Sequence, residues 1–378
     1  MAAHTQVHVD VTREQVLAYR VVAQHLDRSA RAAHEVAVLD IGIQEAMGSS
    51  ASLIFDARLS AGSAPSVGPA AVLALGWTLR GAPHLHRRSD LNGLAGALWP
   101  LSEADARFRL GETGRTVTKS GISALDAFTL AVAAVRSVVT QPMGKGAVST
   151  AVTRKLPAPM GRECRGCKTT HVSDPTLRLA SLPAGVEFEP GGSPPVLVPR
   201  SDAVYPQRPD RPALQRLILA YLRLLGPATS AEVAGYLEGR RVDVAEVWPD
   251  GLAEVRVDGR TAWLPEQQLP ALTTAPAPDL VRLLGPFDPF LQARDRDVLV
   301  PDSALHKALW PVLGRPGVLL VDGEVAGTWR PKLGGGKLTL TVEPFAPLPP
   351  SVWRQVADEG ARVGATRGAT DVHVVKVE

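Results

Sequence analysis

One polar stretch, from Asp40 to Ala46, places an amide and two carboxylates within seven residues of one another. It reads Asp-Ile-Gly-Ile-Gln-Glu-Ala, and Gly42 allows the backbone to turn there or to approach a ligand closely. An amide such as Gln44 can hold a water molecule, and a carboxylate such as Glu45 can stabilise a developing positive charge. The alternative is a polar loop that joins two core helices, and the local pattern leaves both interpretations open.

A second group of polar residues follows a predicted strand over residues 72–80. Strand alternation places His84 and His86 on one face, and Arg87 and Arg88 come next. These residues could donate hydrogen bonds to a phosphate or a base, or they could simply end a strand in polar groups. Two histidines alone would need further ligands nearby to bind a metal.

A third group has the spacing of a metal site. It consists of Cys164, Cys167 and His171. Thiolate and imidazole ligands at this spacing suit a structural zinc ion, which normally takes four ligands. Asp174 or a distant histidine could supply the fourth. The alternative is two thiols in a turn, close enough to oxidise.

The composition describes a folded, mildly basic protein. Its 378 residues are enough for two or three domains, and its 45% hydrophobic content is enough for real cores. A net charge of +3 favours nucleic acid as a partner only if the basic residues are clustered. No run of about 20 apolar residues occurs and residues 1–10 lack an apolar region, so we expect neither a membrane span nor a signal peptide. The expectation is a cytoplasmic monomer.

Two segments must position these groups. Residues 10–118 place helical patterns, including one at about 31–40, before the strand at 72–80. Residues 119–208 read as a long helix, two short helices and two short strands. That order is typical of a winged helix.

The third segment, residues 209–270, has the clearest pattern. Asp210 precedes an apolar helix, and two shorter helices follow it. Strands at 252–257 and 261–264 then flank Asp258-Gly259, which is a hairpin turn signal. Three helices and a hairpin form a winged helix-turn-helix unit.

The last segment, residues 271–378, mixes strands and helices. It begins with a densely charged loop at 285–297, in which we expect the charges to be solvated and paired with one another. If this loop faces a cleft, Arg294 and Arg296 are candidate phosphate contacts. A three-stranded meander, a helix and a closing strand follow.

Several motifs in chain order resemble those of the AlkZ/YcaQ superfamily of bacterial winged-helix DNA glycosylases. They are Gly-Ile-Gln at 42–44, Arg80 with His-Leu-His at 84–86, Phe-Asp-Pro-Phe-Leu at 287–291 with Asp-Arg at 295–296, and Asp-Gly-Glu-Val-Ala-Gly-Thr-Trp-Arg at 322–330. The resemblance implies three tandem winged helices around a concave DNA-binding surface. It also implies excision of bulky N-alkylated purines or unhooking of crosslinks, sometimes as self-resistance in antibiotic producers.

The family's catalytic motif is Gln-x-Gln or Gln-x-Asp, and this chain departs from it. Gln44 takes the first position, but Ala46 takes the second and can neither bind water nor transfer protons. We therefore expect Gln44 to position water and the neighbouring Glu45 to orient it or to stabilise the sugar cation. Trp329 and Arg330, in the last motif, join the candidate DNA contacts.

The function expected is hydrolysis of N-glycosidic bonds in double-stranded DNA that carries alkylated or adducted purines. An N7-alkylated guanine already carries positive charge, so no cofactor is required. Two alternatives remain. One is a catalytically silent winged-helix protein that binds damaged DNA, which Ala46 favours. The other is a transcription regulator that uses the third winged helix.

Overall fold

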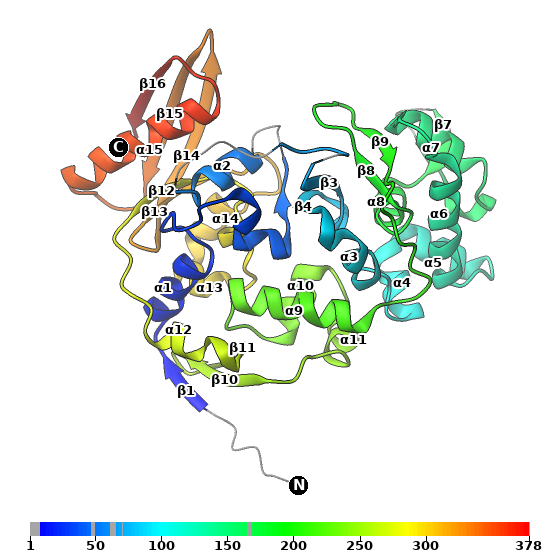
Figure 1. Ribbon diagram of the computed structural model, residues 1–378, viewed down its shortest axis with the longest axis horizontal. Coiled ribbons are helices and arrows are strands. Elements are labelled where there is room, and N and C mark those ends of the chain that lie inside the picture. Colours follow the sequence, from blue (N-terminus) through cyan, green and yellow to red (C-terminus); the bar gives the residue numbers. More distant parts are fainter. Residues whose placement is uncertain are drawn as a thin grey trace.

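Short helices and small sheets alternate along the chain, as its 34 glycines and 32 prolines predict. The computed structural model describes residues 8–46, 50–60, 66–69, 71–164, 166 and 168–377. Within these ranges the strands form one five-stranded sheet, three three-stranded sheets and a two-stranded sheet. The class is therefore α+β, as predicted. In Figure 1 the C-terminal sheet (orange and red) lies at the upper left, and residues 103–199 lie at the right.

The polar stretch and the two histidines share one small antiparallel sheet, with strand order β2-β4-β3. The helix predicted at about 31–40 consists instead of two 3₁₀ turns, Ala33–Glu35 and Ala37–Ile41. Residues 36–39 are apolar and all buried, which one face of an α-helix cannot achieve. The elements of this segment are α1 (Arg13–Ala23), β2 (Ile43–Gln44), α2 (Ser50–Asp56), β3 (Leu73–Trp77), β4 (Pro83–Arg87) and α3 (Leu91–Ala97).

The second segment has a separate hydrophobic core. Its long helix packs Phe128 against Trp99, with ring centroids 5.0 Å apart. Val117 belongs to the same cluster, so this core includes residues that precede the expected boundary at 118/119. The elements are α4 (Glu103–Leu110), α5 (Glu112–Lys119), α6 (Ala124–Val138), β5 (Met143–Gly144), α7 (Lys145–Thr153), β6 (Gly161–Cys164), β7 (Thr169–Val172), α8 (Asp174–Ser181), β8 (Val186–Phe188) and β9 (Val196–Pro199).

The third segment has the predicted order of elements. The Asp210 side chain accepts a hydrogen bond from Ala213 N and caps the first helix. Asp258 and Gly259 both have positive φ, at 47° and 87°, as a two-residue hairpin turn requires. The elements are α9 (Arg211–Leu225), α10 (Ser230–Leu237), α11 (Arg241–Ala245), β10 (Leu252–Val257) and β11 (Arg260–Pro265). The paired strands confirm the predicted hairpin.

The N-terminus completes this hairpin, which sequence reasoning did not anticipate. Strand β1 (His8–Val11) pairs in parallel with β10 and forms the third strand of that sheet. Val16 and Tyr19 of α1 share a core cluster with Val255 and Leu264. The start of the chain therefore stabilises a unit that lies more than half the sequence away.

The C-terminal sheet has the strand order β12-β13-β14-β15-β16, and β16 is parallel to β15. Gly364 of the long helix packs tightly on Val372 of the sheet, because a Cβ there would lie 2.2 Å from that side chain. The elements are α12 (Leu269–Thr273), β12 (Val281–Leu284), α13 (Arg296–Leu299), α14 (His306–Leu309), β13 (Gly317–Val321), β14 (Glu324–Gly334), β15 (Lys337–Pro344), α15 (Pro350–Thr366) and β16 (Asp371–Lys376).

The charged loop at 285–297 is not solvated, so that prediction was wrong for its key carboxylates. Asp288 and Asp295 are buried. Asp288 pairs with Arg58 at 2.7 Å, and Asp295 pairs with Arg20 at 2.5 Å. Buried charges need partners, and here the partners come from the distant first segment rather than from the loop itself.

No single helix in the described ranges is long and apolar enough to cross a membrane. The bent pair α5 and α6 passes that test jointly, by length and composition only.

Candidate active site

Gln44 lies at the edge of the first sheet, opposite a histidine of the neighbouring strand. Strand pairing sets Gln44 opposite His84 and Ile43 opposite Leu85. Paired residues point to the same face of a sheet and neighbours along a strand point to opposite faces. Ile43 and Leu85 are buried in one cluster, whereas Gln44 is half-buried on the other face. The amide is therefore turned away from that core.

Glu45 lies on the opposite side of the strand from Gln44. Its backbone N–H donates to Pro83 O at 2.9 Å, which continues the pairing without a shift of register. Its carboxylate accepts hydrogen bonds from Ala51 N at 3.0 Å and Ser50 N at 3.4 Å, at the start of α2. A carboxylate is stabilised there by the backbone N–H groups that the helix leaves without partners.

Glu45 also lines a cleft of ≈ 680 Å³ on its own face of the sheet. The walls are mainly apolar, and include Phe55, Leu75, Trp77 and Phe188. The two predicted catalytic side chains therefore point to opposite faces of the same strand.

Arg80 holds the Gln44 amide, a contact to which sequence reasoning assigned no role. Its Nη2 donates to Gln44 Oε1 at 3.2 Å, and its Nη1 donates to Tyr236 O at 3.1 Å. Its guanidinium also lies 4.7 Å from the centre of the Tyr236 ring. Arg80 has a φ of 58°, in the left-handed region that non-glycine residues rarely adopt and that clusters at functional sites.

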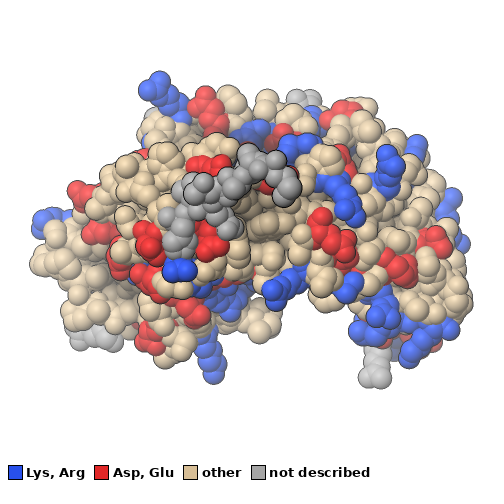
Figure 2. Space-filling model, turned by 90° about the horizontal axis from the view of Figure 1, so that it is seen from below, with Lys and Arg blue, Asp and Glu red and all other residues tan. Residues whose placement is uncertain are grey.

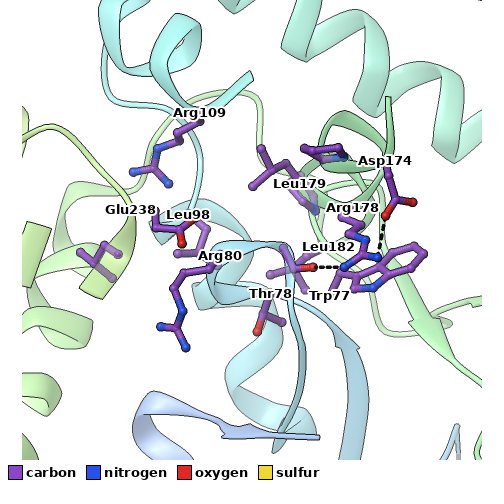
Figure 3. A pocket seen from close by; sticks show the side chains of 14 residues that line it. Trp77, Thr78, Arg80, Leu98, Arg109, Asp174, Arg178, Leu179, Leu182 and Glu238 are labelled. Carbon is purple, nitrogen blue, oxygen red and sulfur yellow. Dashed lines mark hydrogen bonds and ion pairs between the residues drawn. The ribbon is translucent and has the colours of Figure 1, made fainter. Parts of the chain in front are cut away.

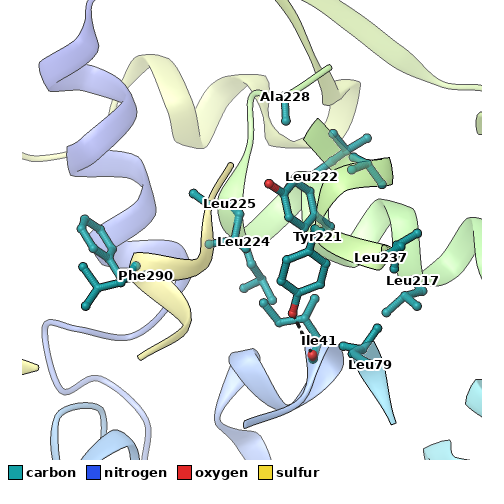
Figure 4. Packing of buried hydrophobic residues seen from close by; sticks show 14 of the residues in the cluster. Ile41, Leu79, Leu217, Tyr221, Leu222, Leu224, Leu225, Ala228, Leu237 and Phe290 are labelled. Atoms are coloured by element: carbon teal, nitrogen blue, oxygen red, sulfur yellow. Dashed lines mark hydrogen bonds between the residues drawn. The ribbon is translucent and has the colours of Figure 1, made fainter. Parts of the chain in front are cut away.

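Tyr236 of the third segment holds both Arg80 and the residues before Gln44 in place. The Tyr236 hydroxyl donates to Ile41 O at 3.2 Å, so α10 fixes the turn that leads into Gln44. Figure 4 shows this bond to Ile41 among the leucines of α9. The Tyr236 and Tyr221 rings lie 4.8 Å apart. The sequence signal that could have indicated this role is Arg80 itself, which the family motif contains.

A smaller pocket of ≈ 230 Å³ lies between β3, α8 and α10. Figure 3 shows Arg178 between Asp174 and the Trp77 ring, with Arg80 pointing away from both. The Arg178–Asp174 ion pair measures 2.6 Å. Arg80 therefore lines this pocket, while its guanidinium group donates a hydrogen bond to Gln44.

His84 and His86 share one face, as the alternation predicted, but both are buried, with 1% of the surface of each exposed. His84 Nδ1 donates to Ala82 O at 2.9 Å, and His86 Nε2 shares a hydrogen bond of 3.0 Å with the Thr78 hydroxyl. Burial lowers the pKa of His84 well below its usual range and the pKa of His86 to about 4. Both rings are neutral at pH 7, and direct contact with DNA would require them to become exposed.

Arg87 and Arg88 have carboxylate partners within the chain. Arg87 pairs with Asp40 at 2.5 Å, and Arg88 pairs with the buried Glu187 at 3.0 Å. Arg88 also donates to two backbone carbonyls, at 2.6 and 3.0 Å. Their contact with DNA stays a prediction. The partners of Arg87 all lie within the first segment, whereas the pair with Glu187 lets Arg88 join the first two segments.

The remaining predicted DNA contacts divide into buried and accessible groups. Trp329 is 1% exposed and donates to Leu284 O at 2.9 Å, so it belongs to the core of the C-terminal sheet. Arg330 is exposed and donates to Gly314 O at 2.8 Å. Arg294 and Arg296 are half-buried on the loop that contains Asp295.

Two of the predicted zinc ligands, Cys164 and His171, lie in the paired strands β6 and β7. His171 Nδ1 donates to Val172 O at 2.8 Å, and this bond and a second one with Cys164 raise the pKa of His171. Cys167 lies outside the described residues. Within the described ranges no three histidine, cysteine or carboxylate side chains converge as a metal site, and zinc binding stays a prediction.

The comparisons with known proteins agree with this fold. The chain matches the family described as AlkZ-like DNA glycosylase over residues 69–366. It also resembles the solved structure of Streptomyces sahachiroi DNA glycosylase AlkZ, with a TM-score of 0.75 and 20% identity over 98% of this chain and 100% of that one. No curated protein matches significantly. Because the family match spans most of the sequence, the chain belongs to the AlkZ-like family of DNA glycosylases.

Proposed function

We propose that this protein hydrolyses the N-glycosidic bond of alkylated or bulky-adduct purines in double-stranded DNA. The observation that carries the proposal is the Gln44 amide, which is half-buried and held at its oxygen by Arg80. The matched family range begins after Gln44, so the catalytic role rests on this geometry and on the motif. No cofactor is needed by this chemistry.

The reaction requires few functional groups from the protein. Cleavage of a glycosidic bond passes through a sugar with oxocarbenium character. An N7-alkylated guanine is already cationic, so it leaves without a general acid. What remains is to hold a water molecule beside C1′. Arg80 occupies one lone pair of Gln44 Oε1, and the other lone pair and the amide N–H₂ group are left to bind that water.

Glu45 takes a secondary role in this proposal. Its carboxylate is committed to the start of α2 and faces the cleft of ≈ 680 Å³ rather than Gln44. It can stabilise a sugar cation by its charge, which acts across the strand, but it does not share a water molecule with Gln44. The cleft's apolar walls, which include Trp77 and Phe188, suit the hydrophobic part of a bulky adduct.

DNA would approach the face formed by the tandem winged-helix units. Figure 2 shows lysine and arginine side chains around a notch in the outline of the molecule. Arg294, Arg296 and Arg330 are the predicted contacts that stay accessible or half-buried. Phosphate contacts of this kind supply affinity and steep salt dependence without reading sequence.

A catalytically silent DNA-binding protein is the second candidate, and position 46 favours it. Position 46 corresponds to the second polar position of the family motif, and Ala46 leaves it without a polar group. Glu45 does not fill it, because it points to the other face.

Release of free base from a duplex that contains N7-alkylguanine, followed by mass spectrometry, decides between the two. We expect Gln44→Ala to abolish release while DNA affinity stays nearly unchanged, because a water-positioning group acts mainly in the transition state. Gln355→Ala, an exposed glutamine on α15, is the matched control and should keep full activity. Wild-type protein that binds the lesion without releasing base would support the silent binder.

A further inference from the structure

Four arginines from three parts of the chain lie near one another, and one of them, Arg80, contacts Gln44. Arg80 precedes β4, Arg294 and Arg296 belong to the charged loop, and Arg315 precedes β13. Arg294 lies against Gly235, since its Cγ atom would be 3.9 Å from a Cβ built on that glycine. The next residue, Tyr236, has the Arg80 guanidinium over its ring. Besides burial, repulsion by each of the other three arginines lowers the pKa of Arg315, so all four are close enough to interact electrostatically.

These guanidinium groups lack the counter-charges found elsewhere in the protein. Among the described residues, no carboxylate lies within ion-pair distance of Arg80, Arg294, Arg296 or Arg315. Burial and then the neighbouring arginines lower the pKa of Arg315, and the same two causes contribute in that order to the lowered pKa of Arg294. By contrast, Arg20 and Arg58 each have a buried aspartate. Glu238 raises the pKa of Arg294 but forms no ion pair with it among the described residues, so the four arginines carry an excess of positive charge.

Aromatic rings and backbone hold the cluster in place without neutralising it. Arg296 lies 4.8 Å from the centre of the Trp310 ring, and Arg315 lies 5.4 Å from that of Phe287. The backbone N–H of Arg294 donates to the Tyr221 hydroxyl at 3.2 Å, while its side-chain Nε is buried without a hydrogen-bond partner among the described residues. A guanidinium stacked on a ring keeps its N–H groups available in the plane, where phosphate oxygens bind.

We propose that Arg80, Arg294, Arg296 and Arg315 form a binding site for the backbone phosphates of the lesion strand, which Arg80 links to Gln44. This inference rests on the proposed function, because it names the part of the DNA that this face receives. A phosphodiester supplies the negative charge that the cluster lacks. Arg80 would then contact both the phosphate and Gln44 Oε1, so that seating the backbone also orients the amide.

The test measures binding of undamaged duplex DNA, so it does not depend on base release. Arg315→Gln and Arg294→Gln are compared with Arg354→Gln, an exposed arginine on α15 that serves as the charge-matched control. Arg315→Lys keeps the charge and should restore most of the salt dependence. Thermal denaturation of every variant verifies folding, and either cluster variant alone suffices if the other fails to fold.

We expect each cluster variant to lower the slope of log K against log salt by about 0.9, one phosphate contact. From about 50 to about 200 mM salt, the variant should then lose roughly 3.5-fold less affinity than wild type. Slopes equal to that of Arg354→Gln would overturn the proposal. Inorganic phosphate that binds as tightly as the duplex would overturn the assignment to a DNA backbone. A lowered slope in a protein that releases no base would support the phosphate site and refute the glycosylase.

Discussion

Replacing Asp288 by asparagine should strongly destabilise the protein, because it would leave the Arg58 guanidinium buried without a counter-charge. Both side chains of this pair are 0% exposed. Arg58 Nη1 and Nη2 donate to the two Asp288 oxygens at 2.8 and 2.7 Å. Removal of one member of such a pair costs about 3–5 kcal/mol. For a protein of this size we expect a fall in melting temperature of about 4–6 °C.

The double variant Arg58→Met/Asp288→Leu separates this cause from simple loss of contacts. Apolar residues of similar volume often replace a buried ion pair at little cost, so the double variant should be more stable than either single one. Glu112→Gln is the control, because Glu112 pairs with Arg162 at the surface, where the side chains are 61% and 65% exposed. It should change stability by less than about 1 kcal/mol.

The measurement is a double-mutant cycle in thermal and denaturant unfolding. Single-variant losses below about 1 kcal/mol, or losses that simply add in the double variant, would refute the reasoning. Either result would mean that water or local rearrangement solvates the remaining charge. The pair joins the residues that directly follow α2, whose first turn binds Glu45, to the loop that contains Arg294 and Arg296.

Three further outcomes are expected around Gln44. Ala46→Gln should raise base release by on the order of 10²-fold, because it restores the polar group at the second position of the family motif; the assay is free base by mass spectrometry, and no gain would contradict it. Gly42→Ala should cost about 1–3 kcal/mol in thermal unfolding, since φ is +78° and the new Cβ would lie 2.4 Å from His86 Cε1; unchanged stability would show that the ring moves freely. The His86 pKa of about 4 lies below its usual 6.5, so the unfolded chain binds the proton more readily, and stability should fall by roughly 3 kcal/mol as pH drops through that window. His86→Gln should lose less stability between about pH 7 and pH 5 than wild type, and equal losses would argue against this assignment.

The sequence predicted well those features that depend on neighbouring residues. The cap at Asp210 and the turn at Asp258-Gly259 both depend on contacts within a few residues. The same is true of the three helices and hairpin of residues 209–265. The helix at 31–40 failed, because burial on all sides overrode its local pattern.

The site itself required the tertiary structure. Gln44 and Arg80 are 36 residues apart, and Arg58 and Asp288 are 230 apart, so no local pattern could pair them. Composition identified polar and basic residues but not which of them were already paired: Arg87 and Arg88 have carboxylates, whereas Arg315 has none among the described residues.

Strand geometry distinguished the two candidate side chains of the polar stretch. In the sequence Gln44 and Glu45 are adjacent and equally suited to chemistry. The register of β2 against β4 turns Gln44 toward Arg80 and Glu45 toward the start of α2. The sequence therefore determined which functional groups are available, and only the folded sheet decided which of them face one another, because alternate side chains of a strand point to opposite sides.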